Sequence, residues 1–168
     1  MSWSDKKYHV KFDYVIEQYG DMVYRIALTI TGNEEDAKDV FQETLLRLVR
    51  YQHKIAGEEH LKAWLIRVAT NCAKTQAANP WNKNTQGMDV KAESGAVVYE
   101  QEEGNLLTEL QKLPGKYSVV LYLYYYEGYS VKDIALTLKK NENSVKTLLA
   151  RGRELLRKRL QEGGNSHE

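Results

Sequence analysis

The sequence Ser130-Val-Lys-Asp-Ile-Ala-Leu-Thr-Leu138 has a short helical pattern, and the polar residues Lys139-Lys-Asn-Glu142 separate it from a longer pattern that runs from Asn143 to about Leu160. Ser130 followed by Asp133 predicts a capping box in which Asp replaces the usual Glu. A short helix, a turn of three or four residues and a longer helix are typical of a helix-turn-helix.

The charge of this region differs from that of the whole chain. The chain has a formal net charge of +1, whereas residues 139–159 contain eight basic and two acidic residues. A lone basic helix is more often simply solvated, but a basic helix attached to a helix-turn-helix pattern favours binding to DNA phosphates.

The second helix of a helix-turn-helix reaches the edges of bases in the major groove with its first residues, while basic side chains contact phosphates. The candidates for base contacts are Asn143, Ser144, Lys146 and Thr147. The candidates for phosphate contacts are Lys140, Arg151 and Arg153.

Three longer helices are predicted upstream, from about Val10 to Thr31, from Glu34 to Arg50 and from Glu58 to Ala78, because apolar residues recur there at steps of three and four. Gly32 suits a left-handed helix end, and Asn33 can cap the second helix. Pro80 ends the third helix. The apolar stripes are expected to include Ile16, Val49 and, in the C-terminal helix, Leu160.

The periodicity fades between Trp81 and Gly104, where five acidic residues accumulate, and this predicts a flexible acidic linker. The segment from Tyr117 to Glu127 could be a strand by composition, but its helical surroundings favour a buried helix. We therefore predict an all-α fold with two small helical domains at residues 8–82 and 105–162, joined by a linker at 83–104.

Several classes of protein are disfavoured by the composition. The single cysteine, Cys72, excludes an intramolecular disulfide and fits a reducing cytoplasm, and no stretch approaches the 18 apolar residues of a membrane span. The four histidines lack metal-ligand spacing, and neither a glycine-rich phosphate loop nor a nucleophile–base motif occurs. We expect a cytoplasmic protein with no membrane insertion, no enzymatic activity, no cofactor and no small-molecule substrate.

Two blocks of the sequence resemble one known family. The C-terminal block is Leu113-Pro114…Tyr126-Glu-Gly-Tyr-Ser130…Asp133-Ile-Ala135…Ser144-Val-Lys146…Arg151-Gly-Arg153, and the N-terminal block is Asp36-Ala-Lys-Asp-Val-Phe-Gln-Glu43 with Trp64-Leu65…Arg67-Val68-Ala69-Thr70-Asn71. In this order, over about residues 10–160, they resemble the sigma factors of bacterial RNA polymerase, in particular the extracytoplasmic-function (ECF) group of the sigma-70 family.

The resemblance implies a subunit that binds core RNA polymerase and directs initiation at promoter DNA, with an anti-sigma protein as a regulatory partner. The C-terminal domain would bind the −35 element. The N-terminal domain would open the −10 element with residues around the end of its third helix, and would dock on the polymerase through its second helix. The implied −10 residues are Asn71, Lys74, Asn79, Trp81 and Lys83, and the implied polymerase-binding residues are Asp36, Asp39, Gln42 and Glu43.

The residues leave alternatives open for both sets. Asp39, Gln42 and Glu43 share one helix face, which without the resemblance is more often just solvated. Trp81 could cover the core rather than contact a base. The family usually has a basic cluster after the position of Asn71 and an arginine at that of Leu148, and the absence of both here lowers the expected affinity for DNA.

Two other functions compete with this interpretation. The chain could be a helix-turn-helix regulator that binds DNA alone and uses its N-terminal helices for sensing or dimerisation. It could also be a helical adaptor whose basic end only increases solubility. Neither alternative requires an acidic linker.

Overall fold

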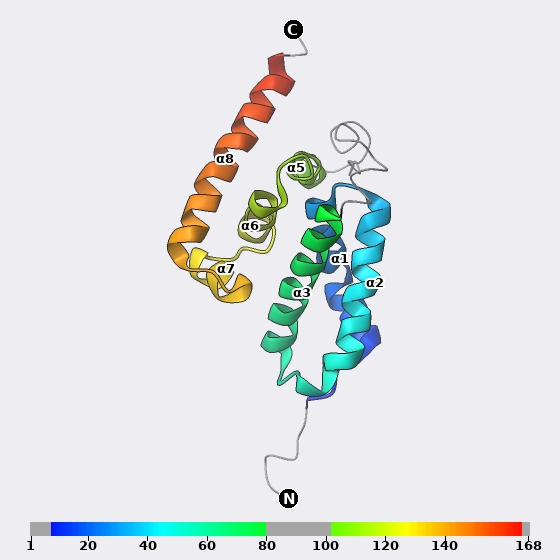
Figure 1. The fold of residues 1–168 in the computed structure, drawn as a ribbon. Coiled ribbons are helices and arrows are strands. Elements are labelled where there is room, and N and C mark those ends of the chain that lie inside the picture. Colours follow the sequence, from blue (N-terminus) through cyan, green and yellow to red (C-terminus); the bar gives the residue numbers. More distant parts are fainter. Residues whose placement is uncertain (1–7, 80–101, 166–168) are drawn as a thin grey trace, which may run out of the picture.

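The computed structural model describes residues 8–79 and 102–165, and all the regular elements in these ranges are helices, as predicted. The first range forms a bundle of α1 (Phe12–Thr31), α2 (Glu34–Tyr51) and α3 (Glu58–Ala78), with a short 3-10 helix, η2 (Gln52–Lys54), between α2 and α3. Each of the three long helices packs on the other two (Figure 1). The predicted linker lies mostly outside the described residues.

The second range forms the C-terminal unit, which consists of α5 (Glu102–Leu110), α6 (Gly115–Tyr125), α7 (Val131–Leu138) and α8 (Glu142–Asn165). Helix α5 thus includes the last three residues of the range predicted as linker. The segment whose composition also suited a strand is the helix α6, which confirms the interpretation as a buried helix.

Local hydrogen bonds set the ends of the first helices. Gly32 has φ 75°, and its N–H donates to the Leu28 carbonyl, so the left-handed end predicted for α1 is confirmed. Asn33 then caps α2, because its side-chain oxygen accepts from the Asp36 N–H at 2.8 Å. These two neighbouring residues reverse the chain and make α1 and α2 pack side by side.

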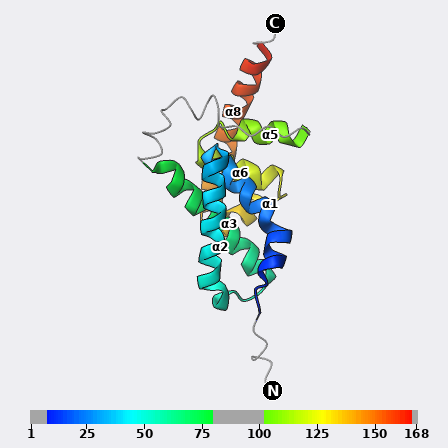
Figure 2. The ribbon, with the colours of Figure 1, turned by 90° about the vertical axis from the view of Figure 1, so that its right-hand side faces the viewer.

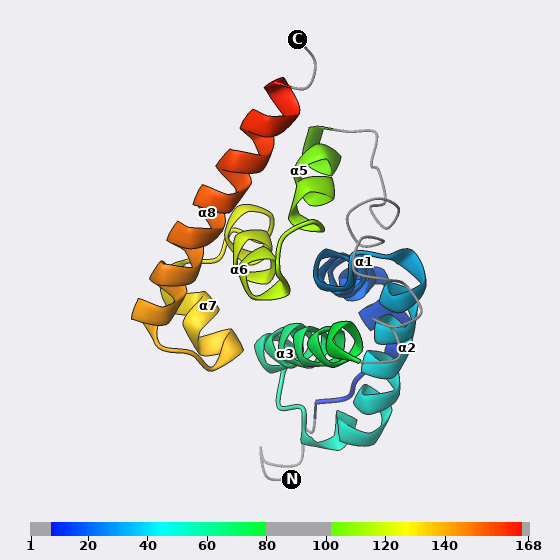
Figure 3. The ribbon, with the colours of Figure 1, turned by 45° about the horizontal axis from the view of Figure 1, so that its top comes forward.

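Helix α6 lies at the centre of the C-terminal unit. Six consecutive residues, Ser118 to Leu123, are buried, so the helix is covered around its whole circumference. It packs on α5, α7 and α8 of its own unit and also on α1 of the bundle. Figure 3 shows this position, with α8 on one side of α6 and the bundle on the other, and Figure 2 views the molecule from the side of the bundle.

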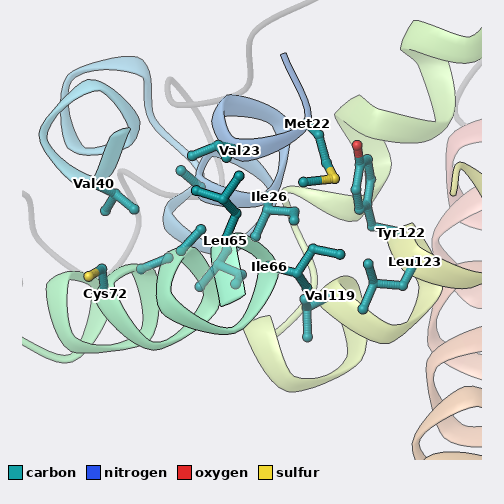
Figure 4. Close-up of a cluster of buried hydrophobic side chains, with 14 of the residues drawn as sticks. Met22, Val23, Ile26, Val40, Leu65, Ile66, Cys72, Val119, Tyr122 and Leu123 are labelled. Carbon is teal, nitrogen blue, oxygen red and sulfur yellow. The ribbon is translucent and has the colours of Figure 1, made fainter. Parts of the chain in front are cut away.

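The bundle and the C-terminal unit share one hydrophobic core. Met22 and Ile66 of the bundle point toward Tyr122, Val119 and Leu123 of α6 in the close-up of Figure 4. All five side chains are at most 6% exposed. In this structure the two parts that the sequence separates into domains are therefore packed together.

Three residues predicted for the apolar stripes are exposed instead. Ile16 is 48%, Val49 49% and Leu160 55% exposed. Val15 and Leu48, one position earlier, take the buried places of the first two, with exposed fractions of 1% and 0%. Leu160 lies near the end of α8, and the last turns of this helix extend beyond the other helices in Figure 1.

Candidate nucleic-acid and partner interfaces

Hydrogen bonds define the turn of the predicted helix-turn-helix. The Ser130 side chain accepts from the Asp133 N–H at 3.0 Å, and the Asp133 carboxylate accepts from the Ser130 N–H at 3.4 Å, which confirms the capping box. Lys139 ends α7 in the left-handed region, with φ 56°. The Asn141 side chain then caps α8 by accepting from the Ser144 N–H at 2.7 Å, a cap that the sequence interpretation missed.

The first turns of α8 present the predicted base contacts to solvent. Asn143, Ser144, Lys146 and Thr147 are all exposed, while Val145 is fully buried and anchors the helix from behind. The Thr147 hydroxyl donates to the Asn143 carbonyl at 3.0 Å, so only its acceptor capacity remains for a base. The arrangement can place four adjacent polar side chains in a major groove.

The three predicted phosphate contacts are exposed around the same helix-turn-helix. Arg153 donates to the Tyr125 hydroxyl at 2.9 Å, and its guanidinium lies 5.2 Å from the centre of the Tyr124 ring. Within the described residues, Lys140 and Arg151 form no ion pair, whereas Arg157 pairs with Glu154 at 2.6 Å. The unpaired cations therefore lie beside the turn and the first half of α8, next to the candidate base contacts.

The predicted polymerase-binding residues fall into two groups. Asp39 and Gln42 are exposed on α2, and Glu43 is half-buried and pairs with Arg47 at 3.0 Å. The Asp36 carboxylate is buried, and it accepts from the side-chain amides of Asn33 at 2.7 Å and Gln76 at 3.1 Å. Asp36 thus connects α2 to the end of α3 and contributes little to the outer face.

Two apolar residues extend this face of α2 and were not predicted as part of it. Leu46 is 53% and Val49 is 49% exposed. Leu46 lies four residues after Gln42, and Val49 lies three residues after Leu46, so helical spacing continues the face. That spacing is the signal that could have found them. We call Asp39, Gln42, Glu43, Leu46 and Val49 the α2 face.

The described −10 candidates lie on the second half of α3. Asn71 and Asn79 are exposed, whereas Lys74 is half-buried. Burial, and to a smaller extent the nearby charge of Lys140, lowers the pKa of Lys74. Trp81 and Lys83 lie outside the described residues.

Within residues 8–79 and 102–165, no group of three or more His, Cys, Asp and Glu side chains could hold a metal ion. The helices of these ranges also include none that combines the length and apolar character needed to cross a membrane.

Comparison with known families identifies the two parts of the chain. The model for Sigma-70 region 2 matches residues 15–81, and the model for Sigma-70, region 4 matches residues 103–156. These ranges contain nearly all of the helical bundle and the helix-turn-helix, and together they cover most of the chain. The chain belongs to the sigma-70 family.

Individual relatives of this sigma-70 protein are ECF sigma factors. ECF RNA polymerase sigma factor SigW of Bacillus subtilis is 28% identical over 164 residues, which cover 88% of each chain. ECF RNA polymerase sigma factor SigL of Mycobacterium tuberculosis is 29% identical over 155 residues, again 88% of each chain. The predicted ECF group is thereby confirmed.

A solved structure has the same fold. The sigma factor RpoE from Bartonella quintana, in a complex with the anti-sigma factor NepR, matches with a TM-score of 0.70 at 19% identity, over 89% of this chain and 96% of RpoE. Family membership makes this chain a non-catalytic subunit for promoter-specific transcription initiation, rather than an enzyme.

Proposed function

We propose that this sigma factor binds core RNA polymerase through the α2 face, opens the −10 element with the end of α3 and binds the −35 element with α7 and α8. The domain division would be 8–82 and 105–162. One observation carries the −35 assignment. The four candidate base contacts at the start of α8 are exposed side by side, on a helix that is capped by Asn141 and anchored by the buried Val145.

The α2 face supports the docking part of the proposal. It combines the acid Asp39, the amide Gln42 and the apolar side chains Leu46 and Val49 on the exposed side of one helix. Apolar side chains surrounded by polar ones are typical of protein interfaces rather than of DNA contacts. The acidic end of the α2 face also repels DNA phosphates.

The end of α3 supports the −10 part less directly. A base that leaves the duplex must be held by polar or stacking contacts, and Asn71 and Asn79 offer exposed amides. Lys74 supplies a cation between them. Regulation by an anti-sigma protein is also proposed, because RpoE, which shares the fold, is bound by NepR.

The proposal is tested by transcription in vitro from a fragmented genomic library, with core polymerase and with or without this protein. We expect new start sites that share two spaced upstream elements. DNA binding by the protein alone, with no new start sites, would instead support a free-standing regulator. Loss of function on deleting residues 1–85, with no loss on deleting 130–160, would support an adaptor.

Single substitutions then test which residues of the helix-turn-helix contact bases and which contact phosphates. Asn143→Ala should reduce transcription from promoters with the preferred −35 bases about 5- to 150-fold, because a lost base contact costs about 1–3 kcal/mol, and should relax the preference at one position. Arg151→Ala should weaken binding at all sequences alike and reduce the salt dependence by about one ion. Lys38→Ala, on α2 away from the helix-turn-helix, is the control for a lost positive charge.

A further inference from the structure

The end of α6 carries two tyrosines that lie beside α8 and have no part in the proposed function. Helices α6 and α8 pack on each other (Figure 3). The side chain of Tyr125, the last residue of α6, is 49% exposed, and that of Tyr124 is half-buried. The two rings meet edge to face, with their centres 5.0 Å apart. Two aromatic rings therefore lie next to the helix that carries the candidate base contacts.

The side chain of Arg153, in α8, is held against these rings. Its Nε donates to the Tyr125 hydroxyl at 2.9 Å, and its guanidinium carbon lies 5.2 Å from the centre of the Tyr124 ring. A cation at this distance from an aromatic face is attracted to it. The contacts fix the guanidinium without neutralising it, because an aromatic ring and a hydroxyl, unlike a carboxylate, bring no opposite charge.

The charge of Arg153 differs in this respect from that of the next arginine. Arg157 pairs with Glu154 at 2.6 Å. In the part of the chain that the structure describes, Arg153 has no acidic partner at ion-pair distance. Its bond to Tyr125 uses one of its five N–H donors, so its two terminal nitrogens can bind an anion.

The Tyr125 hydroxyl offers a further donor. Its oxygen accepts from Arg153, so its own proton can be donated to another group. A hydroxyl that accepts a hydrogen bond from a cation becomes a stronger donor, because the bonds polarise one another. Tyr125 and Arg153 thus present O–H and N–H donors side by side. A phosphate, which combines negative charge with several acceptor oxygens, matches this set.

Helical spacing places this pair at the edge of the groove that α8 would enter. Lys146 and Arg153 are seven residues apart, so they lie on the same side of α8 and about 10 Å apart along its axis. The major groove is about 12 Å wide. With Lys146 at the bases, Arg153 and Tyr125 therefore reach a strand that borders the groove. Arg151 lies about 200° around the helix from Arg153 and is directed toward the other strand.

Acidic side chains close in sequence do not cancel the positive charge of this surface. Glu154 already pairs with Arg157. Glu127 accepts from the Tyr122 hydroxyl at 3.0 Å and pairs with Lys62, in α3, at 3.7 Å. Its charge is therefore directed toward the bundle rather than toward the groove.

We propose that Tyr125 is a further DNA-binding residue, and that its hydroxyl and the Arg153 guanidinium together bind one phosphate of the −35 element. Tyr124 is a positioning residue, because its ring holds the guanidinium in place. This inference rests on the proposed function, since it requires α8 to enter the major groove at that element. An acidic protein surface would match the same donors, but the alignment of the pair with Lys146 favours DNA.

Tyr125→Phe tests the hydroxyl alone, because the ring beside Arg153 remains. The full chain with core polymerase is titrated onto a promoter identified by transcription in vitro, and the dissociation constant is measured by fluorescence anisotropy. We expect binding to weaken about three- to tenfold at every promoter alike, with an unchanged salt dependence, because a neutral donor to a phosphate is lost. Tyr14→Phe, which removes a hydrogen-bonded hydroxyl from a 40% exposed tyrosine of α1, is the matched control and should bind like the wild type.

A double-mutant cycle shows whether the two side chains act on one phosphate. Arg153→Ala should weaken binding more than Tyr125→Phe and should reduce the salt dependence by about one ion. In the double variant, the loss of affinity should be smaller than the product of the two single losses. Single losses that simply multiply would contradict a shared phosphate.

Neutralised phosphates locate the contact. In a series of promoter duplexes, one phosphate of the −35 element at a time is replaced by an uncharged methylphosphonate. We expect one position at which the wild type binds more weakly and Tyr125→Phe causes no further loss. If Tyr125→Phe causes the same loss at every position, its hydroxyl binds no phosphate of the element and the proposal is wrong.

The outcomes separate this inference from the proposed function. If wild-type protein with core polymerase starts no transcripts, the proposed function itself is wrong. If Asn143→Ala weakens promoter binding and Tyr125→Phe does not, the proposed function stands and Tyr125 is not a DNA contact. If Tyr125→Phe instead weakens assembly with core polymerase, titrated without DNA, the hydroxyl binds a protein and the proposal is overturned.

Discussion

The bundle and the C-terminal unit achieve their stability in different ways. In the bundle, three helices of 18 to 21 residues pack on one another, and each keeps an exposed face. In the C-terminal unit, the 11-residue α6 is covered all round, and one of its covers is α1 of the bundle. The bundle therefore contains most of its own core, whereas the C-terminal unit depends on a single central helix.

Truncation of a central side chain in each part should have the largest effect. Tyr122→Ala should lower the free energy of unfolding by about 3–5 kcal/mol, because the ring is fully buried between both parts and its hydroxyl donates to Glu127 at 3.0 Å. Leu65→Ala, in the bundle, should cost about 2–5 kcal/mol. Urea denaturation followed by circular dichroism measures both.

The Tyr122→Ala and Leu65→Ala variants should differ in their effect on the contact between the bundle and the C-terminal unit. Only Tyr122→Ala should also make the two parts unfold in separate transitions. Leu136→Ala, which alters a side chain 68% exposed on α7, is the control and should change stability by less than about 0.5 kcal/mol. A single common transition for Tyr122→Ala would show that α6 does not couple the parts.

Glycines in the two parts should respond in opposite directions. A Cβ at Gly152 of α8 would lie 3.0 Å from Cδ1 of Leu121 and 3.3 Å from Cβ of Tyr117, so Gly152→Val should destabilise by about 1–3 kcal/mol. A Cβ at Gly20 of α1 would meet only ordinary contacts, the nearest at 3.7 Å. Gly20→Ala should therefore stabilise by about 0.5–1 kcal/mol, measured as the urea midpoint.

Removal of a helix cap should have a smaller effect on stability, and each part contains one cap to test, Asn33 in the bundle and Ser130 in the C-terminal unit. Ser130→Ala should cost about 1 kcal/mol, and Asn33→Ala removes an equivalent cap. The Asn33 substitution should cost more, because its amide also donates to the buried Asp36 carboxylate at 2.7 Å. Hydrogen exchange of the first turns of α2 and α7 would locate the losses, and equal costs would contradict the role of Asp36.

The smallest effect concerns pH and the start of α3. The hydroxyls of Tyr8, Tyr14 and Tyr19 all donate to Glu58, at 2.7 Å from Tyr8 and 2.6 Å from Tyr14, and these bonds hold the pKa of Glu58 below its usual range. Burial and the Glu58 contact raise the pKa of Tyr8 to about 12. Because the folded pKa of Glu58 is depressed, its contribution is present above its unfolded pKa and is lost as pH falls through the folded value.

Glu58→Gln isolates this contribution. We expect it to lower stability at pH 7 by less than about 1 kcal/mol, since the carboxylate is exposed, and to have almost no effect well below pH 4. Glu59→Gln, at the next position of the same helix, is the control. Equal losses at both pH values would show that the tyrosines bind Glu58 without favouring its charged form.

Much of the fold could be predicted because its signals are local. The bounds of α3, the end of α1 at Gly32 and the caps Asn33 and Ser130 depend on residues within a few positions of one another. The strand-like composition of α6 was resolved only by its neighbours. Leu48 and Val49 were both expected in the core because adjacent residues can both fit a broad apolar stripe, but only Leu48 is buried.

In the candidate site too, features that depend on neighbouring residues could be predicted, and features that depend on distant residues could not. The exposed residues of the helix-turn-helix follow from the caps and spacing around them. The role of Asp36 could not be predicted, because its second partner, Gln76, lies 40 residues away. The packing of α6 on α1 was also missed, since an acidic segment between two helical blocks gives no information about whether the blocks touch.

The packing of α6 on α1, where Gly115 at the start of α6 lies against Ile30, has a consequence for evolution. With 2.9 Å between a Cβ at position 115 and the Ile30 side chain, a larger residue at one position is tolerated only if the other becomes smaller. Among relatives that keep the two parts packed, the two positions should therefore change together. In relatives whose parts remain apart, this constraint disappears and the two positions should vary independently.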